Sequence, residues 1–334
     1  MKRAGDNRKL NRRILGRSHL EVSSLGLGCW GMSHAYGKAD EKESLATVNF
    51  CLDRGINFLD TADVYGDGHN EMLLAKVLKH RRHEAVLATK FGFVGDEHGK
   101  IGVNGRPGYV RAACEKSLKR LGIDVIDLYY FHRRDPGVPI EETVGAMAEL
   151  VNEGKIRYIG LSEISSATLR KAQSIHPVTA LQSEYSLWHR DVEKEILPAC
   201  SELGVSLVPF SPLGRGFLTG TITAAGDLSS GDYRQNLPRF DAEAMKRNQS
   251  MVSGLLHLAD QVGATPSQLA LAWLLARDKH IVPIPGMKHR KYVDENLAAM
   301  DLELSDAVRQ KLEGLFAEVY GLRHNRHNLQ HMET

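Results

Sequence analysis

The sequence predicts an α/β fold: a (β/α)8 barrel of the TIM type, with an N-terminal β-hairpin and a candidate active site at its C-terminal face. Two observations carry this prediction. Eight short apolar runs, typical of buried strands, alternate with segments whose apolar residues recur at helical spacing. A polar or aromatic residue also stands at or just past the end of each run. Eight parallel strands close such a barrel, and its functional residues lie at the carboxyl ends of the strands.

The chain divides into three predicted parts. Residues 1–11 are expected to form a flexible basic tail, residues 12–320 a single domain, and residues 321–334 a C-terminal tail. Apolar runs at 13–16 and 20–22 flank a short polar turn, which predicts the β-hairpin.

Eight predicted strands follow the hairpin, at residues 25–29, 56–59, 85–89, 125–131, 156–161, 178–181, 205–210 and 281–284. Between them, apolar residues at i, i+3, i+4 spacing predict helices that include residues 43–54, 106–121, 140–153 and 266–276. Alternating strands and helices imply parallel pairing through right-handed crossovers.

An open doubly wound sheet is the alternative fold, because residues 26–31 fit the pattern G-x-G-x-x-G. That fingerprint needs a helix that opens at the glycines and an acidic residue about 20 positions later. Residues 32–38 are instead typical of a loop. We interpret the glycines as the tight end of the first strand, which carries Trp30 toward the site.

Composition narrows the class of protein. The chain is 42% hydrophobic and 25% charged, as ordinary globular proteins are, and its net charge of +2 argues against a dedicated nucleic-acid binder. No apolar run approaches the roughly 20 residues of a membrane span, and no apolar segment follows the basic N-terminus, as a secretory signal would require. Scattered cysteines without CxxC spacing predict free thiols in a reducing compartment. They are Cys29, Cys51, Cys114 and Cys200. We expect a cytoplasmic protein.

Polar and aromatic residues gather at the predicted strand ends. They are Trp30, Asp60, Lys90, His132, Ser162, Gln182, Ser211 and Lys288. Such residues would be costly in a packed core but are natural at a barrel mouth. Two long connections, 92–108 and 214–240, leave the same face and are expected to act as lids.

Three of these residues, together with Tyr65, suit proton transfer to a carbonyl oxygen. A phenol has a free pKa near 10 and is a weak acid. We expect Lys90, as a nearby cation, to lower the pKa of Tyr65. Asp60 would balance the buried charge of the lysine. His132 offers an N–H to orient the carbonyl. Each residue alone is more often a structural cap or a simple hydrogen-bonding residue.

The flanking stretches carry a family resemblance. They read DTADVYG at 60–66, ATKFG at 88–92, GLSE at 160–163, EYSLW at 184–188 and SPLGRGFLTG at 211–220. With Asp60, Tyr65, Lys90 and His132 in this order, the chain resembles the aldo-keto reductases from about residue 13 to residue 300, especially their bacterial and plant branch. The resemblance implies NADPH-dependent reduction of aldehydes or ketones, with Tyr65 as proton donor.

A basic run after the last predicted strand indicates an anion site. Gly286 is followed by Met287, Lys288, His289 and Arg290, which open a predicted helix. Cations are disfavoured at a helix N-terminus by the helix dipole, so this cluster favours an anion bound between backbone N–H groups and basic side chains. A solvated basic turn is the alternative.

The resemblance assigns the remaining cofactor contacts. It implies that the basic run clamps the 2′-phosphate of NADPH, and that Phe210 stacks on the nicotinamide. The other implied contacts are Gly286, Lys288, Arg290, Glu295 and Asn296 at the adenosine end, Ser211, Leu213 and Gly216 at the pyrophosphate, Ser162 and Gln182 at the carboxamide, and Trp30, which is also expected to bind the cofactor.

The chain departs from the family pattern at three positions. Met287 stands where Ser or Thr is common, and His289 where Arg is common, which bears on the preference for NADPH over NADH. Glu163 stands where many relatives have Asn, and we expect this acid to face a nearby arginine.

Three aromatic residues, Trp30, Phe93 and Trp188, are predicted to wall the substrate pocket, with core packing as the alternative for each. The lids contain no readable code for a particular carbonyl substrate, and the oligomeric state is equally unreadable. The alternative function is a cofactor-sensing regulatory subunit like the potassium-channel β-subunits, which share the barrel and the tetrad.

No metal-binding constellation appears at a strand end, which argues against a metal-dependent barrel hydrolase. His324, His327 and His331 lie at near-helical spacing near the chain end, where a mobile polar tail is a simpler explanation than a metal site.

Overall fold

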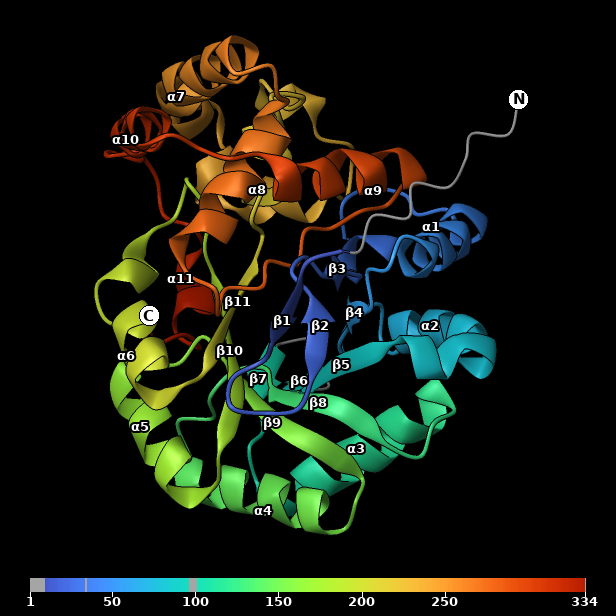
Figure 1. The fold of residues 1–334 in the computed structure, drawn as a ribbon. Coiled ribbons are helices and arrows are strands. Elements are labelled where there is room, and N and C mark those ends of the chain that lie inside the picture. Colours follow the sequence, from blue (N-terminus) through green and yellow to red (C-terminus); the bar gives the residue numbers. More distant parts are fainter. Residues whose placement is uncertain (1–9, 34, 96–100, 334) are drawn as a thin grey trace.

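Parallel strands form the centre of the structure, a computed structural model that describes residues 10–33, 35–95 and 101–333. Most of the predicted basic tail, residues 1–9, lies outside the described residues. Seven strands lie side by side in the order β11-β10-β9-β8-β5-β4-β3 (Figure 1). Their bounds are β3 (Leu27–Gly28), β4 (Phe58–Asp60), β5 (Val86–Phe91), β8 (Ile126–Phe131), β9 (Ile156–Ser162), β10 (Val178–Glu184) and β11 (Ser206–Phe210).

Residues 280–286 close this sheet into a barrel. On one side their backbone N–H groups donate to two carbonyls of β11. On the other side the carbonyls of Pro283 and Pro285 accept from the N–H groups of Gly26 and Gly28, next to and within β3. Proline has no N–H, so this segment makes isolated parallel bridges rather than a regular strand. The predicted (β/α)8 barrel is confirmed, with an irregular eighth strand.

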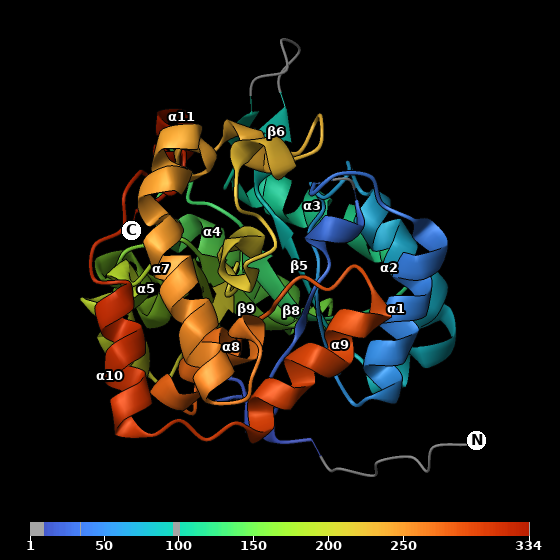
Figure 2. The ribbon, with the colours of Figure 1, turned by 90° about the horizontal axis from the view of Figure 1, so that it is seen from above.

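Helices surround the barrel, as the view from above shows (Figure 2). Those that follow barrel strands are α1 (Glu41–Asp53), α2 (His69–Arg81), α3 (Pro107–Leu121), α4 (Ile140–Asn152), α5 (Ser166–Ile175), α6 (Ile196–Leu203), α8 (Pro266–Arg277) and α9 (Arg290–Leu297). Further helices are α7 (Ala242–Gln261), α10 (Asp306–Leu315) and α11 (Arg326–Leu329). None of the helices in the described part of the chain combines the length and apolar character that a membrane span requires.

The N-terminal hairpin contributes to the core inside the barrel. It pairs β1 (Arg12–Ile14) with β2 (Glu21–Ser23) in antiparallel register. Its buried residues Leu15, Leu20 and Val22 belong to one cluster with Phe58 and Leu128 on the barrel strands. The hairpin therefore fills the end of the barrel away from the strands' carboxyl ends, which leaves the opposite face for a site.

The two predicted lids both contain secondary structure. The connection 92–108 includes an antiparallel ribbon of β6 (Phe93–Gly95) and β7 (Ile101–Val103). The connection 214–240 contains several short 3-10 helices, the first of which spans Gly214–Thr219.

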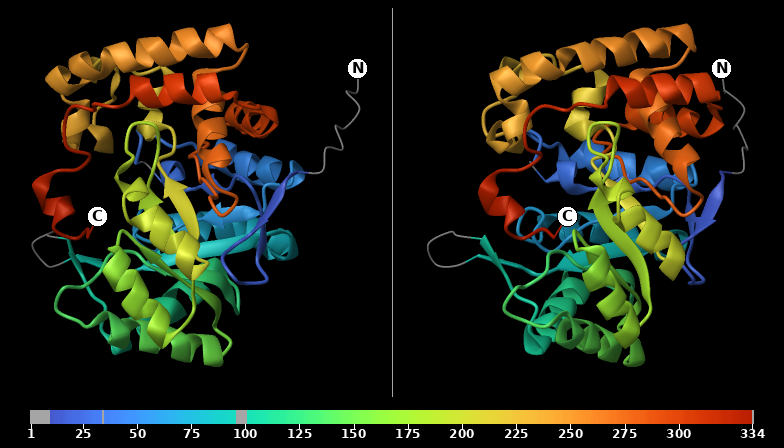
Figure 3. Two further views of the ribbon diagram at one scale, coloured as in Figure 1. Left: turned by 60° about the vertical axis from the view of Figure 1, so that its left-hand side comes forward. Right: turned by 90° about the vertical axis from the view of Figure 1, so that its left-hand side faces the viewer.

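Residues 321–333 pack against the barrel, which the prediction of a C-terminal tail at 321–334 did not include. Both views in Figure 3 show this red segment running from α10 toward the green elements of the barrel. Arg323 and His324 are buried, and the backbone N–H of Glu333 donates to the carbonyl of Glu163 at 3.0 Å. Sequence pattern did not reveal this packing, because the segment's partners lie far away in the sequence, with Arg239 at a separation of 82 residues and Glu163 farther still.

Candidate active site

A cavity of about 670 Å3 lies at the carboxyl ends of the strands. Many of the predicted site residues line it: Trp30, Asp60, Tyr65, Phe93, His132, Gln182, Phe210, Ser211, Leu213, Gly216, Gly286, Lys288, Glu295 and Asn296. Residues from strands far apart in the sequence thus meet at one face, as parallel strands in a barrel require.

Lys90 lies beneath the cavity, fully buried on β5. Its Nζ donates to Asp60 Oδ1 at 2.5 Å, to the carbonyl of Thr61 at 2.7 Å and to Tyr65 Oη at 3.1 Å. An ammonium has three N–H donors, so these three acceptors match a charged lysine. Burial lowers the pKa of Lys90, but the attraction of Asp60 and Tyr65 outweighs burial and raises it. Burial also raises the pKa of Asp60, although the positive charge of Lys90 lowers it in part. Because all three N–H groups of Lys90 find an acceptor, we describe Asp60 and Lys90 as an ionised pair.

The chain turns directly after β4, where the N–H of Tyr65 donates to the carbonyl of Ala62 at 3.2 Å, and this turn brings the phenol back toward the lysine. The turn continues past Tyr65. Gly66, Asp67 and Gly68 all have φ between 53° and 82°, the left-handed conformation that glycine adopts readily. The expected lowering of the phenol's pKa is not what the structure shows. Burial raises the pKa of Tyr65 above its ordinary value, and Lys90 only limits the rise. The phenol is therefore protonated at neutral pH, as a proton donor must be.

His132 lies beside the phenol, with 5.9 Å between the two ring centroids. Burial, followed by the charges of Arg133 and Lys90, brings the pKa of His132 well below its ordinary value. The imidazole is therefore neutral and can donate one N–H. Its Nδ1 atom is buried and makes no hydrogen bond to any residue in the described part of the chain.

The two residues predicted to contact the carboxamide, Ser162 and Gln182, lie in different surroundings. Gln182 lines the cavity, and its Nε2 donates to Asp60 Oδ2 at 2.8 Å, which holds the carboxylate from the side opposite Lys90. Ser162 is buried but is not among the lining residues, and its Oγ accepts from Arg133 Nη1 at 3.1 Å. Glu163 does face an arginine, as expected, since Arg323 Nη1 lies 2.6 Å from its Oε2.

The wall at β11 and α9 fits the phosphates of a nicotinamide dinucleotide. Gly214, Arg215 and Gly216 have positive φ values of 56°, 56° and 95° and form a tight turn, in which the N–H groups of the two glycines donate to the carbonyls of Ser211 and Leu213. Cationic side chains line the same cavity at Arg215, Arg234 and Lys288. Basic side chains of this kind make charge-assisted hydrogen bonds to phosphates.

Arg290 and Lys288 differ in placement. Lys288 is half-buried in the cavity wall, with its Nζ donating to the carbonyl of Tyr36 at 2.7 Å. Arg290 is exposed, does not line the cavity, and pairs with Glu43 at 3.0 Å. His289 does line the cavity.

Trp188 does not line the cavity, contrary to its prediction as a substrate wall. It is 3% exposed and stacks on Phe217 with ring centroids 4.2 Å apart, while Phe240 packs on it edge to face. The core-packing alternative describes it correctly. Trp30 and Phe93 do line the cavity, and Tyr233 packs edge to face on Trp30.

Several lining residues were not singled out from the sequence: Tyr36, Arg133, Arg215, Tyr233, Arg234 and Met332. Arg133 could have been found, because it directly follows His132 at the end of a predicted strand. The C-terminal residues had no such signal. In the described part of the chain, no three His, Cys, Asp or Glu residues form a group that could hold a metal ion.

Comparisons with known proteins agree with this geometry. The chain matches the Aldo/keto reductase family over residues 24–316. "Probable aldo-keto reductase 1" from Glycine max is 46% identical over 294 residues, which cover 87% of this chain and 85% of that protein.

Three solved structures share the fold. The glycerol dehydrogenase AKR11B4 from Gluconobacter oxydans has a TM-score of 0.82 at 26% identity, covering 97% of this chain and 96% of its own. The holo form of aldo-keto reductase AKR11C1 from Bacillus halodurans scores 0.75 at 31% identity, covering 96% and 99%. The thermostable aldo-keto reductase Tm1743, in complex with the inhibitor epalrestat, scores 0.71 at 33% identity, covering 92% and 100%.

The family match spans most of the chain, from the first barrel strand to the last long helix. The chain therefore belongs to the aldo/keto reductase family, whose members are oxidoreductases that reduce carbonyl compounds with a nicotinamide cofactor.

Proposed function

We propose that the protein reduces aldehydes or ketones to alcohols with NADPH, and that Tyr65 donates the proton. The observation that supports this most strongly is the position of the Lys90 ammonium, which bridges Asp60 and the phenol of Tyr65 directly beneath the cavity. The bound cofactor supplies the hydride that adds to the carbonyl carbon. As hydride adds, the carbonyl oxygen gains negative charge and needs a proton.

The tetrad supplies that proton and holds the oxygen. The neutral imidazole of His132 donates an N–H to the carbonyl oxygen and orients it. Tyr65, whose pKa burial raises above its ordinary value, is protonated at neutral pH and gives its proton to the same oxygen. The phenolate left behind lies beside Lys90, whose positive charge stabilises it. Asp60 keeps this lysine charged and in place.

Residues on the other side of the cavity suit NADPH. In this proposal Phe210 stacks on the nicotinamide and Gln182 holds the carboxamide. The turn at 214–216 cradles the pyrophosphate, and Lys288 contacts the 2′-phosphate. Glu295 and Asn296, which line the same wall, lie near the adenine.

The Tyr65→Phe variant tests the proton donor. It removes the hydroxyl and keeps the ring, and general acid catalysis contributes typically about 10²–10⁴-fold. We expect kcat for carbonyl reduction to fall by that order, while NADPH affinity, measured by fluorescence quenching, changes little. A panel of aldehydes and ketones, followed by NADPH absorbance, gives the wild-type reference.

Two results would contradict the proposal. If Tyr65→Phe keeps more than about a third of kcat with hydride transfer rate-limiting, another group donates the proton. If the wild type binds NADPH tightly but turns over none of the panel, the regulatory alternative is favoured instead.

A further inference from the structure

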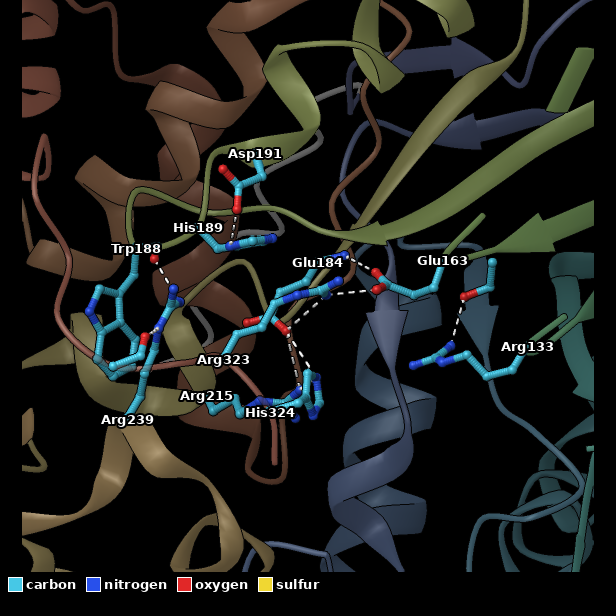
Figure 4. A network of polar contacts seen from close by, with 12 residues as sticks. Arg133, Glu163, Glu184, Trp188, His189, Asp191, Arg215, Arg239, Arg323 and His324 are labelled. Carbon is cyan, nitrogen blue, oxygen red and sulfur yellow. Dashed lines mark hydrogen bonds and ion pairs between the residues drawn. The ribbon is translucent and has the colours of Figure 1, made fainter. Parts of the chain in front are cut away.

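Arg133 is a buried cation in the cavity wall that has no carboxylate partner among the described residues. It directly follows His132 and is 7% exposed. Its Nη1 donates to the carbonyl of His132 at 2.6 Å and to Ser162 Oγ at 3.1 Å. The Nε and Nη2 atoms make no hydrogen bond to any described residue. In Figure 4 no dashed line joins Arg133 to Glu163, although the two are drawn near each other.

The neighbouring arginines are satisfied differently. Arg323 lies 2.6 Å from Glu163, and Arg215 lies 3.5 Å from Glu184. Arg323 is thus the closest cation to Glu163. The charge of Glu163 still raises the pKa of Arg133, against the larger effect of burial. A guanidinium does not lose its proton in proteins, so Arg133 stays charged despite its burial.

The whole network around Arg133 carries more cations than anions. Figure 4 labels four buried or largely buried arginines, Arg133, Arg215, Arg239 and Arg323, and two buried glutamates, Glu163 and Glu184. Burial lowers the pKa of both histidines in the network, so neither adds a fixed positive charge at neutral pH. Asp191 lies at its exposed rim. A buried excess of positive charge is costly in isolation and attracts an anion into the cavity.

Arg133 is also close to the reacting groups. The ring of Phe93 packs against the imidazole of His132 with centroids 4.8 Å apart, and the Arg133 guanidinium lies 5.7 Å from the same ring. The ring of Phe93 is therefore in contact with both His132, which would orient the carbonyl, and Arg133, which is incompletely paired.

The geometry points to Arg133 as an anion-binding subsite for the substrate: it binds a carboxylate or phosphate that a carbonyl compound carries a short chain away from its carbonyl group. This inference rests on the proposed function, which puts the carbonyl oxygen at Tyr65 and His132. The cofactor's own pyrophosphate is assigned to the turn at 214–216, which follows β11, whereas Arg133 follows β8. The free face of the guanidinium is therefore available to the substrate.

The test compares matched pairs of substrates. One pair is 4-oxobutanoate and butanal, and the other is glyceraldehyde 3-phosphate and glyceraldehyde. We expect the wild type to prefer at least one charged member through a lower KM, and the pair that shows the preference identifies a carboxylate or a phosphate as the anion. In Arg133→Met, the ratio of kcat/KM for the charged member to that for the neutral one should fall tenfold or more, since a charge-assisted contact is worth roughly that factor.

Two further variants separate binding from structure. Arg133→Lys keeps the charge and should recover part of the preference. Arg134→Met removes the neighbouring arginine, which pairs with Glu333, and should leave the preference unchanged. An equal loss of kcat/KM for both members in Arg133→Met, without recovery in Arg133→Lys, would show a structural role and overturn the subsite.

A binding measurement keeps this test independent of turnover. Succinate and inorganic phosphate are titrated into the protein saturated with NADP+, and the binding is followed by calorimetry. We expect one of them to bind the wild type and to bind Arg133→Met at least tenfold more weakly. If the anion binds the wild type and Arg133→Met equally well, the subsite is overturned even if no substrate is turned over. If anion binding depends on Arg133 but no substrate is turned over, the result counts only against the proposed function.

Discussion

At Tyr65, burial and a neighbouring cation act on the phenol in opposite directions. The sequence showed which cation is near but not how deeply the phenol is buried, and burial determines the net direction of its pKa. The effect of Lys90 on the pKa of Tyr65 can therefore be measured only by comparing the wild type with a variant that lacks this lysine. Removing the cation should raise the pKa of the phenol further.

The Lys90→Met variant measures this difference. In the reduction direction Tyr65 must be protonated, so activity is lost as pH rises through its pKa. Without Lys90 that pKa is higher, so the alkaline limb of the kcat/KM profile should move to higher pH, and the plateau should fall. Asp60→Asn combined with Lys90→Met removes the stranded carboxylate and controls for misfolding. A profile that overlays the wild type after normalisation would show that Lys90 does not tune Tyr65.

Lys288 and Arg290, which the sequence grouped together, can now be separated. Lys288 lies in the cavity wall, whereas Arg290 pairs with Glu43 outside it. We expect Lys288→Gln to weaken NADPH binding about tenfold or more and to change NADH binding little, since one charge-assisted contact is lost. Arg290→Gln breaks an exposed pair worth about 0–1 kcal/mol and should have a smaller effect.

The readout is a fluorescence titration of both nucleotides at low and high salt. The preference of the wild type for NADPH should shrink as salt rises, because partly exposed charges are screened. A larger loss of NADPH affinity in Arg290→Gln than in Lys288→Gln would mean that Arg290 leaves Glu43 to bind the 2′-phosphate. If a variant loses affinity for NADPH and NADH equally, the residue replaced does not recognise the 2′-phosphate.

At the scale of elements, the sequence predicted the strands better than the connections. The seven regular barrel strands overlap their predicted runs, because strands buried on both faces are nearly continuous apolar segments. The eighth is irregular because Pro283 and Pro285 lack N–H groups. The ribbon of β6 and β7 and the packing of residues 321–333 were missed, since a lid has no periodic apolar face and a C-terminal segment finds its partners only in the folded barrel.

The C-terminal segment is held by one buried ion pair in particular. Arg323 neutralises Glu163, which is fully buried and has a φ of 53° at the end of β9. Arg323→Met leaves this carboxylate without its closest cation, and breaking a buried pair costs roughly 3–5 kcal/mol. The backbone N–H of Glu184 still donates to Glu163, so we expect a loss near the lower end of that range in urea unfolding.

Two comparisons make this result specific. Glu163→Gln combined with Arg323→Met removes both charges and should recover part of the stability. Arg309→Met breaks the exposed pair with Asp306 on α10 and should cost no more than about 1 kcal/mol. If Arg323→Met is no more destabilising than Arg309→Met, the ion pair does not hold the segment in place.

At the scale of the whole molecule, several ionisable groups are buried with shifted pKa values, and their effects on stability have opposite signs. Burial lowers the pKa of His132, His189 and His324, so the folded protein resists protonating them. Acidification below about pH 6.5 therefore favours the unfolded chain through these histidines. Asp63 acts in the opposite direction, because burial, reinforced by Glu71, raises its pKa to about 7.

Asp63 offers the clearest test because it can be replaced by a residue that does not ionise. An unfolded aspartate has a pKa near 3.9. Between about pH 4 and pH 7 the folded protein keeps a proton on Asp63 that the unfolded chain has released, so this group's contribution to stability falls as pH rises. One buried oxygen of Asp63 also makes no hydrogen bond to a described residue. We therefore expect Asp63→Asn to gain stability relative to wild type between pH 5 and pH 8, by on the order of 1–3 kcal/mol.

Urea unfolding at pH 5 and at pH 8 measures the gap, which is the difference in free energy of unfolding between the variant and the wild type. Asp67→Asn removes an exposed carboxylate from the same turn and is the control. Its difference from wild type should be the same at both pH values. A gap for Asp63→Asn that stays constant or narrows as pH rises would show that Asp63 is already ionised in the folded protein at pH 5.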